Sequence, residues 1–476
     1  MNEKSPDPTE AKESGTPFQR EVLQVALPVT AQATIISLLS LTDQVMVGQL
    51  GETAVSAVGI VSKITSILTV MLTGIATATS VFCAQFWGNG QRAQIHQVFG
   101  IALRFSMTVT ILMLLAALGW PHLLISVFTT DGSVLAAGGA FLRIIAIGYV
   151  PTTLTLLYAA VLRSAKLVKL AMYAGISSVI LNVVLDYLLI FGSFGAPRLG
   201  LQGAALATTI ARFTELGIIV VVSYYTRNIA AVTRWSDTYC SEPGLRKRFL
   251  LVALPLSVNE LLWILGESAY AAVYGRMGTG SLAAMSMTFP LQGLSIGFMS
   301  GLSTAAAVLI GQRLGRSDFV EAKSYGKRLT GLGIGLSVVI GALLAFGAPY
   351  YAKLYALSAE VQHSGVLCLF VFSGFMWVKV ANMILCGAVL NSGGDSRFVL
   401  IMESSATWLL GVPLAIVGAF VLELPVAWVY FLLSLEEVVR LIAGFWRFRS
   451  GRWARNLVGT ANDAAATGKP SLELSE

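Results

Sequence analysis

The chain has 476 residues, of which 55% are hydrophobic and only 12% are charged, and its formal net charge is +7. Its mean hydropathy is +0.75. So few charges cannot solvate the surface of a soluble protein of this length, so the composition excludes a soluble globular chain and indicates an integral membrane protein.

Twelve apolar stretches are long enough to cross a bilayer, which takes about 20 residues each. A segment exposed to lipid must satisfy its own backbone hydrogen bonds, so all twelve are predicted to be helices. They are expected at 22–48, 54–83, 97–120, 134–162, 168–192, 202–226, 249–275, 281–311, 329–347, 363–390, 398–421 and 424–446.

The spans divide the chain into two lobes with polar segments around them. Residues 1–20 mix acids, bases and prolines and contain no apolar signal-peptide core, so they are expected to be a disordered tail. The N-lobe would cover 21–226, and a basic linker with Pro243 and Gly244 as its turn would cover 227–248. The C-lobe would cover 249–456, followed by a polar tail at 457–476.

The two lobes repeat each other, because residues 28–90 align with residues 255–317 at a constant offset of 227 without a gap. Helices rich in Gly, Ala and Leu match by composition alone, but matched Pro, Gln and Gly in one register indicate a duplication. The matched pairs include Pro28 and Pro255, Gly51 and Gly278, Gly74 and Gly301, Gln85 and Gln312, and Gly88 and Gly315. Six helices per lobe is an even number, so the pseudo-twofold axis is expected along the membrane normal.

Basic residues predict the orientation, because they concentrate in the connections on one side of the membrane. If the N-terminus is cytoplasmic, the outside connections hold only Arg198, Arg276 and Lys353. Both termini are therefore expected in the cytoplasm. The same asymmetry explains the net charge through topology and attraction to anionic lipid, so no nucleic-acid partner is expected.

In the N-lobe, two acids stand out inside apolar spans, where a charge is costly unless it serves a function, whereas Glu215 is closer to the membrane interface and is expected to be structural. Asp43 lies in the first span and Asp186 in the fifth, with Asn182 one turn before Asp186 on the same helix face. Such a group can hold a proton or a Na⁺ ion, because either relieves buried negative charge and Asn supplies a neutral oxygen. The alternative is that each acid only ends a helix or satisfies a neighbouring hydroxyl.

The C-lobe carries different polar residues. Glu260 and Glu267 lie seven residues apart on nearly one face of the seventh span, with Trp263 between them. Carboxylates beside an aromatic ring suit a lipophilic cation, although a packing role for Glu260 and Trp263 is equally compatible with the sequence. Lys63 and Lys379 either pair with a cavity acid or extend along their helices to the membrane surface, and Glu403 is expected to be structural.

The sequence contains no catalytic pattern. Its three histidines are scattered, and it has no Gly-x-Ser-x-Gly, P-loop or HExxH motif, so an enzyme and ATP as energy source are not expected. The four cysteines form no CxxC pair, which argues against a disulfide framework or a zinc site. No cofactor is expected beyond a coupling ion.

Over residues 20–457 the chain resembles the multidrug and toxic compound extrusion (MATE) family of secondary transporters. The motifs that carry the resemblance are Thr42-Asp43-Gln44-Val45-Met46-Val47-Gly48, Gln85-Phe86-Trp87-Gly88, Leu162-Arg163-Ser164, Asn182-Val183-Val184-Leu185-Asp186 and Gly203-Ala204-Ala205-Leu206-Ala207-Thr208. The resemblance implies a bacterial inner-membrane protein with two six-helix lobes that exports organic cations or toxic compounds in exchange for H⁺ or Na⁺, as a monomer.

By the same resemblance, the family's N-lobe cation site corresponds to Asp43, Asn182, Asp186 and Thr208 in this sequence, with Na⁺ at the first three as one option. On the seventh span, Trp263 stands where one branch of the family has an acid, and Glu267 follows one turn later. The substrate is therefore expected to contact Glu260, Trp263, Glu267 and Lys379. A lipid-linked saccharide flippase of the same superfamily is the alternative, for which Lys63 and Lys379 are a weak indication.

Overall fold

The computed structural model describes residues 18–129, 131–231, 244–355 and 357–458, apart from the side chains of 37–41, 43–45 and 52. Every regular element in these ranges is helical. Because the chain is all-helical and rich in apolar spans, the expected fold class is confirmed for this part of the protein.

In the described residues, the N-lobe consists of eight α-helices and one short 3₁₀ turn. These are α1 (Phe18–Gly48), α2 (Glu52–Gly88), α3 (Arg92–Gly119), α4 (Pro121–Ser126), α5 (Gly132–Ile147), α6 (Tyr149–Ser164), α7 (Val168–Phe191), η2 (Ser193–Gly195) and α8 (Leu201–Tyr225).

The C-lobe has longer helices, and three of its α-helices run into π-helical turns. Its elements are α10 (Leu245–Arg276), α11 (Thr279–Gly315), α12 (Phe319–Ala352), α13 (Ala359–Ile384), η3 (Leu385–Leu390), α14 (Ser396–Ser405), η4 (Ala406–Gly411), α15 (Val412–Ile416), η5 (Val417–Val421) and α16 (Val426–Ser450).

These elements make twelve membrane crossings. Within the described ranges, nine helical spans are long and apolar enough to cross a membrane, and α5 with α6, bent by 42° at Gly148, forms a tenth. The remaining two are α1, with 31 residues, and α16, with 25 residues and three charged side chains in its middle. Boundaries of the predicted segments also differ. The helix α1 begins at Phe18, so residues 18–20 belong to it and not to the predicted tail, and α10 begins at Leu245, so the linker is shorter than 227–248.

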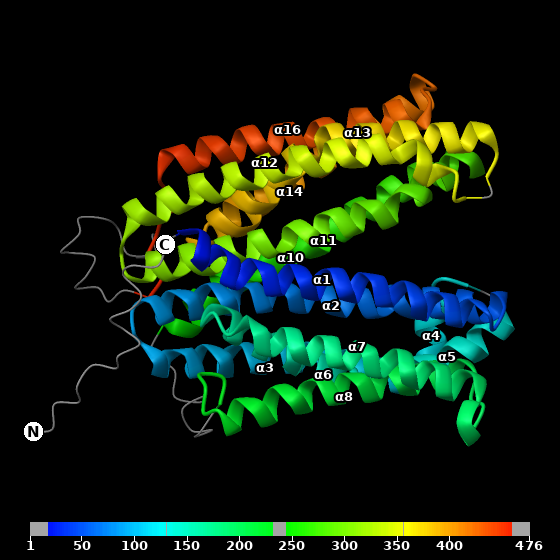
Figure 1. Cartoon of the computed structure of the whole chain (residues 1–476), viewed down its shortest axis with the longest axis horizontal. Coiled ribbons are helices and arrows are strands. Elements are labelled where there is room, and N and C mark those ends of the chain that lie inside the picture. The colour runs from blue at the N-terminus through cyan, green and yellow to red at the C-terminus, as the bar shows by residue number, and fades with distance from the viewer. Residues whose placement is uncertain (1–17, 130, 232–243, 356, 459–476) are drawn as a thin grey trace, which may run out of the picture.

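The helices lie side by side in two lobes (Figure 1). In that view the N-lobe is below the C-lobe, and α1 begins at the left end, where α16 also finishes. We call this the terminal end of the bundle. From there α1 and α2 on one side, and α11 on the other, diverge toward the right.

At the terminal end, α2 and α11 approach each other at two glycines related by the sequence repeat. A Cβ on Gly88 would collide with the backbone carbonyl of Gln312, and a Cβ on Gly315 would collide with that of Gln85. The glutamine side chains cross between the lobes in the same mirrored way. Gln85 Nε2 donates to the Ser392 carbonyl and Gln312 Nε2 to the Ser164 carbonyl, both over 2.7 Å.

A second mirrored pair of contacts lies farther along the same helices. A Cβ on Gly74 would collide with the backbone of Ser257, and one on Gly301 would collide with Thr30. The hydroxyl of Ser257 donates to the Met71 carbonyl over 3.1 Å, and that of Thr30 donates to the Phe298 carbonyl over 3.0 Å. Each partner is displaced from its counterpart by 227 residues, so the duplication read in the sequence also organises the interface between the lobes.

Two further connections cross between the lobes at the terminal end. Glu21 on α1 accepts from Arg313 over 2.9 Å and from Tyr325 over 2.8 Å, and it also pairs with Lys166 over 3.4 Å. After α16, the backbone N–H of Leu457 donates to Gln85 Oε1 over 2.7 Å.

The end of the C-lobe therefore differs from the sequence-based boundary at 456. Leu457 and Val458 are buried in a hydrophobic cluster that otherwise consists of N-lobe residues and the start of α10. They are apolar residues that reach the opposite lobe, so they do not belong to a polar tail. Residues 459–476 of the expected tail, and 1–17 at the other terminus, lie outside the described residues.

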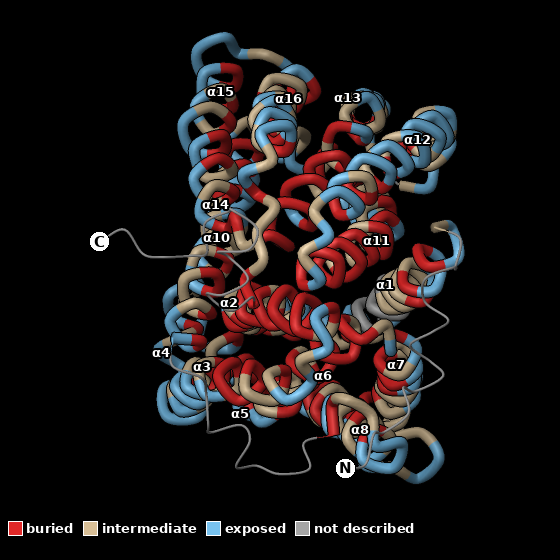
Figure 2. The backbone as a smooth tube through the Cα atoms, turned by 90° about the vertical axis from the view of Figure 1, so that its left-hand side faces the viewer, coloured by how far each residue is buried: buried red, intermediate tan, exposed pale blue. Residues whose placement is uncertain are grey.

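The outer surface is apolar where a bilayer would contact it. Figure 2, viewed along the helices, shows buried residues in the interior and exposed residues on the outward faces of α8, α12 and α15. Exposed side chains on α12 include Val339, Leu343 and Phe346, at 59%, 66% and 75%. Large apolar residues so exposed are stable only in lipid or a partner, which agrees with the membrane assignment.

We predict that Gly315→Ala weakens the contact between the lobes, because the new methyl group cannot fit against the Gln85 carbonyl. Overpacking of this kind typically costs about 1–3 kcal/mol. The melting temperature of purified protein in detergent should fall, and Gly88→Ala should have the same effect because it is the mirrored position.

Gly331→Ala on α12 is the matched control, since a Cβ there meets nothing within 4 Å. An alanine at that position should leave the melting temperature unchanged or raise it slightly. Equal melting temperatures for Gly315→Ala and Gly331→Ala would contradict the close approach.

Candidate functional site

In the N-lobe, the structure places three of the four predicted cation-site residues on two neighbouring helices. Asn182 on α7 donates from Nδ2 to Thr208 Oγ1 on α8 over 3.5 Å. Asp186, one turn further along α7, is fully buried at 0% exposure. The fourth residue, Asp43, lies in α1, but its side chain is outside the described residues.

This arrangement follows from helix geometry. Residues 182 and 186 are four apart, so they lie on one face of α7. The helices α7 and α8 pack along each other, and α1 packs on α7 from the other side. α7 ends at Gly192, whose φ of 72° lies in the left-handed region that terminates helices. The structure thus brings Asn182 to Thr208, places Asp186 one turn away on the same face of α7, and packs α1 against α7.

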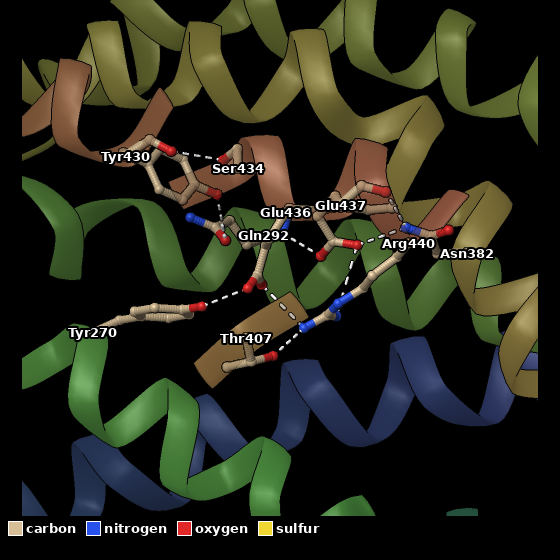
Figure 3. Close-up of polar contacts among 10 residues, drawn as sticks. Tyr270, Gln292, Asn382, Thr407, Tyr430, Ser434, Glu436, Glu437 and Arg440 are labelled. Atoms are coloured by element: carbon tan, nitrogen blue, oxygen red, sulfur yellow. Dashed lines mark hydrogen bonds and ion pairs between the residues drawn. The ribbon is translucent and has the colours of Figure 1, made fainter. Parts of the chain in front are cut away.

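The C-lobe holds a larger polar network, built around adjacent carboxylates on α16 (Figure 3). Glu436 and Glu437 are 4% and 8% exposed, and Arg440 on the same helix is 8% exposed. Arg440 Nη2 lies 3.0 Å from Glu436 Oε1, and its Nη1 lies 3.8 Å from Glu437 Oε2. One guanidinium therefore pairs with both acids.

Glu437 has two further partners on α13. Lys379 Nζ lies 3.1 Å from Glu437 Oε1, and Asn382 Nδ2 donates to Glu437 Oε2 over 2.8 Å. Lys379 is thus in an ion pair with a buried acid. The sequence offers this pairing as one interpretation of Lys379, beside its expected role as a substrate contact. Lys63, the other lysine inside a predicted span, is exposed on α2.

Glu436 is held by α10 and by the π-helical turn η4. Tyr270 donates its hydroxyl to Glu436 Oε2 over 2.7 Å, and Arg440 donates to the Thr407 hydroxyl in η4. Gly411 ends that turn, and a Cβ there would collide with both Glu436 and Tyr270. A π-turn adds one residue to a helical turn, and such turns are frequent at functional sites. Here η4 places Thr407 next to Arg440 and Gly411 next to Glu436.

The predicted substrate residues on α10 lie beside the same network. Glu267 is exposed but within electrostatic range of Lys379, Glu437 and Arg440. Trp263, one turn earlier on the same face, is 49% exposed.

Glu260 lies near Glu403, whose Oε2 accepts from Asn259 over 2.6 Å. Glu403 was expected to be structural, and this hydrogen bond to α10 is compatible with that role.

Charge in the C-lobe site is unbalanced. It brings together five carboxylates, on Glu260, Glu267, Glu403, Glu436 and Glu437, with two cations, on Lys379 and Arg440. Removing unpaired charges from water costs several kcal/mol each, so protons or bound cations stabilise such a site. The arrangement can therefore take up positive charge from the aqueous phase or from a ligand.

Sequence analysis missed Glu436, Glu437 and Arg440, although a signal was present. All three lie inside the predicted span 424–446, and the criterion that selected Asp43 and Asp186, a charge within an apolar span, applies to them equally. Their pairing with Lys379 and Thr407 could not be predicted, because these partners come from distant parts of the chain.

The predicted Na⁺ site remains a prediction. Within the described residues, no three His, Cys, Asp or Glu side chains are grouped as a metal site would require. The side chain of Asp43, one of the three residues predicted to bind Na⁺, is not among the described residues.

Comparison with known proteins finds one family model, MatE, which matches twice, over residues 28–188 and 255–417. The two matches begin 227 residues apart, which is the offset of the internal repeat.

An uncharacterized transporter, YisQ, of Bacillus subtilis is 23% identical over 90% of this chain and 93% of its own length. A probable multidrug resistance protein, NorM, of Bacillus cereus is 27% identical over 85% of this chain and 90% of its own.

A solved structure has the same fold. It is the outward-facing conformation of a multidrug resistance MATE family transporter of the MOP superfamily. It matches with a TM-score of 0.83 and 19% identity, over 91% of this chain and 96% of that one. At this level of identity the likeness establishes the fold alone.

We predict that Lys379→Met destabilises the protein by about 3 kcal/mol, because it leaves a buried Glu437 without its closest cation. The double variant Lys379→Met, Glu437→Met should recover most of that loss, since it no longer has a buried carboxylate at position 437 without its closest cation. Thermal unfolding of purified protein measures both effects. Lys63→Met is the control, since Lys63 is exposed, and it should shift the melting temperature little. A double variant no more stable than the single one would contradict the pairing.

Proposed function

The chain belongs to the MatE family, and we propose that it is a secondary antiporter that exports organic cations or other toxic compounds in exchange for H⁺ or Na⁺. The observation that carries this proposal is the excess of carboxylates over cations in the C-lobe site. Such a site attracts positive charge. Relatives named as probable multidrug resistance proteins, which match most of the chain, support export of toxic compounds.

For the coupling ion we propose the N-lobe group of Asp43, Asn182, Asp186 and Thr208. Asp186 is fully buried, and Asn182, one turn before it on α7, donates to the Thr208 hydroxyl on α8. A carboxylate with neutral oxygens around it can bind a proton or, with Asp43, a Na⁺ ion. No other cofactor is part of the proposal.

For the substrate we propose the face of α10 that carries Glu260, Trp263 and Glu267. Trp263 and Glu267 are both exposed and lie one turn apart, so a cation can contact the indole ring and the carboxylate together. Lys379 acts indirectly, because its ammonium group holds Glu437 and lies within electrostatic range of Glu267.

Transport would occur by alternating movement of the two lobes. The mirrored contacts of α2 and α11 with the opposite lobe hold the lobes together at the terminal end, which supports an outward-facing state if that end is cytoplasmic. We propose this orientation, with both termini in the cytoplasm of a bacterial cell and a monomer in the inner membrane.

A lipid-linked saccharide flippase is less well supported. It would favour a cavity rich in basic residues, and the two lysines that indicated one do not provide it. Lys379 is paired with Glu437, and Lys63 is exposed on α2.

We predict that Asp186→Asn abolishes coupled export, while Glu267→Gln mainly weakens substrate affinity. The first change removes titratable charge from the proposed ion site. The second deletes a charge-assisted contact worth about 1.5–3 kcal/mol, which corresponds to a roughly ten- to hundredfold loss of affinity. Efflux of a cationic dye from proteoliposomes, under separately imposed pH and Na⁺ gradients, measures both variants.

The control is Glu360→Gln, an exposed acid in the first turn of α13, which should export dye at the wild-type rate. Wild-type pumping by Asp186→Asn would exclude the N-lobe site. If Glu267→Gln kept its dye affinity but lost its response to the ion gradient, the coupling site would belong to α10.

Orientation can be tested with single cysteines at repeat-related, exposed positions. Gln49→Cys and Arg276→Cys should react with an impermeant thiol reagent added outside cells, and Ala93→Cys and Val320→Cys should not. The three native cysteines in the described ranges are buried, and Cys240 can be replaced by Ser in all variants. Labelling of Val320→Cys from outside would contradict the proposed topology.

A further inference from the structure

A groove of about 730 Å³ lies between α10 and α14 near the terminal end of the bundle. Its walls are apolar, and three basic side chains line it together with Gly244. The apolar lining consists of Leu250, Leu251, Leu254, Pro255, Val258 and Leu400, and the basic lining consists of Arg246, Lys247 and Arg397.

Charge and apolar surface are ordered along the groove. Arg246 and Lys247 lie in the first turn of α10 and Arg397 in the first turn of α14. The apolar wall continues from there along α10, where Lys247, Leu250, Leu254 and Val258 recur at helical spacing on one side. The distance from residue 247 to residue 258 along the helix is about 16 Å, roughly half the thickness of a bilayer core.

The wall is open to the surroundings, because Leu254 is 59% and Val258 43% exposed. In Figure 2, α14, α10 and α3 follow one another down one side of the bundle. The groove is therefore on the lipid-facing side, away from the polar network of the C-lobe.

The basic residues keep their positive charge available. All three are exposed, and within the described ranges none of them forms an ion pair with a carboxylate. Asp395, two residues before Arg397, pairs instead with Arg447 through two contacts of 2.6 and 2.9 Å. Arg246 also lies 5.4 Å from the ring of Phe105 on α3, so the basic cluster reaches the neighbouring lobe.

We propose that this groove binds an anionic glycerophospholipid from the membrane leaflet at the terminal end. The lipid phosphate contacts Arg246, Lys247 and Arg397, and an acyl chain lies along Leu250, Leu254 and Val258. A zwitterionic lipid would leave the three charges without a net counter-charge, and a soluble anion would leave the apolar wall unused. Basic pockets between membrane helices recognise lipid head groups in this way.

The proposal goes beyond transport and does not depend on it. It has a mechanical consequence, since α10 carries Pro255 in the groove and Ser257 in contact with Met71 of the N-lobe. A bound lipid would therefore lie against the helix that joins the groove to the interface between the lobes.

Native mass spectrometry of the purified full-length protein, titrated with dioleoyl phosphatidylglycerol or dioleoyl phosphatidylcholine, tests the site. We expect the wild type to bind phosphatidylglycerol more tightly. The triple variant Arg246→Gln, Lys247→Gln, Arg397→Gln should lose about fivefold in affinity per charge, on the order of a hundredfold in all. A triple control, Lys323→Gln, Lys327→Gln, Arg452→Gln, removes three exposed charges elsewhere and should bind like the wild type.

The apolar wall has its own test. Leu254→Asn should weaken binding of the dioleoyl lipid and leave binding of glycerol phosphate unchanged, and melting temperatures report whether each variant is folded. Equal affinity for the two dioleoyl lipids, or equal losses in both triple variants, would overturn the proposal. So would glycerol phosphate binding as tightly as the lipid, because the site would then recognise a soluble anion.

Discussion

The arrangement of the lobes depends on the close approach of α2 and α11 to the opposite lobe, which is possible only where the side chain is a hydrogen atom. At Gly88 and Gly315 the backbone of one lobe occupies the space that any other side chain would need. Gln85 and Gln312 then satisfy carbonyl groups across the interface. Because each contact occurs twice under the same pseudo-twofold axis, a single geometric solution holds both lobes at the terminal end.

The symmetry of this interface contrasts with the chemistry inside the lobes. The N-lobe has Asp186 with Asn182 and Thr208, whereas the C-lobe has adjacent acids on α16 with Lys379 and Arg440. Duplication thus preserved the residues that bring the lobes together and not those within them. Two different interiors attached to one symmetric interface allow one lobe to specialise in an ion and the other in a second ligand.

The sequence predicts what depends on local or repeated patterns. Helix-length apolar stretches predict the twelve spans, and the paired Gly and Gln residues predict the duplication that the interface displays. The C-lobe site is less accessible to such reasoning. Its charges on α16 are visible in the sequence, but the contact of Arg440 with Thr407 depends on the π-turn η4, which arises from tertiary packing. The burial of Leu457 likewise depends on a hydrophobic cluster formed largely by the opposite lobe.

The contacts at the terminal end also contribute to the free energy needed to separate the lobes there. Opening that end would break the links of Gln85 to Ser392, Gln312 to Ser164, Arg316 to Gly88, Leu457 to Gln85 and Glu21 to Arg313. At a net value of about 1 kcal/mol per hydrogen bond, and more for the charged pairs, these links contribute roughly 5 kcal/mol or more. Reversing a 1:99 population of two states takes about 5.5 kcal/mol of differential binding. These five hydrogen bonds alone are therefore of the size that a ligand's preference for one of two states can offset, and packing of the lobes against each other adds to the free energy that the ligand must supply.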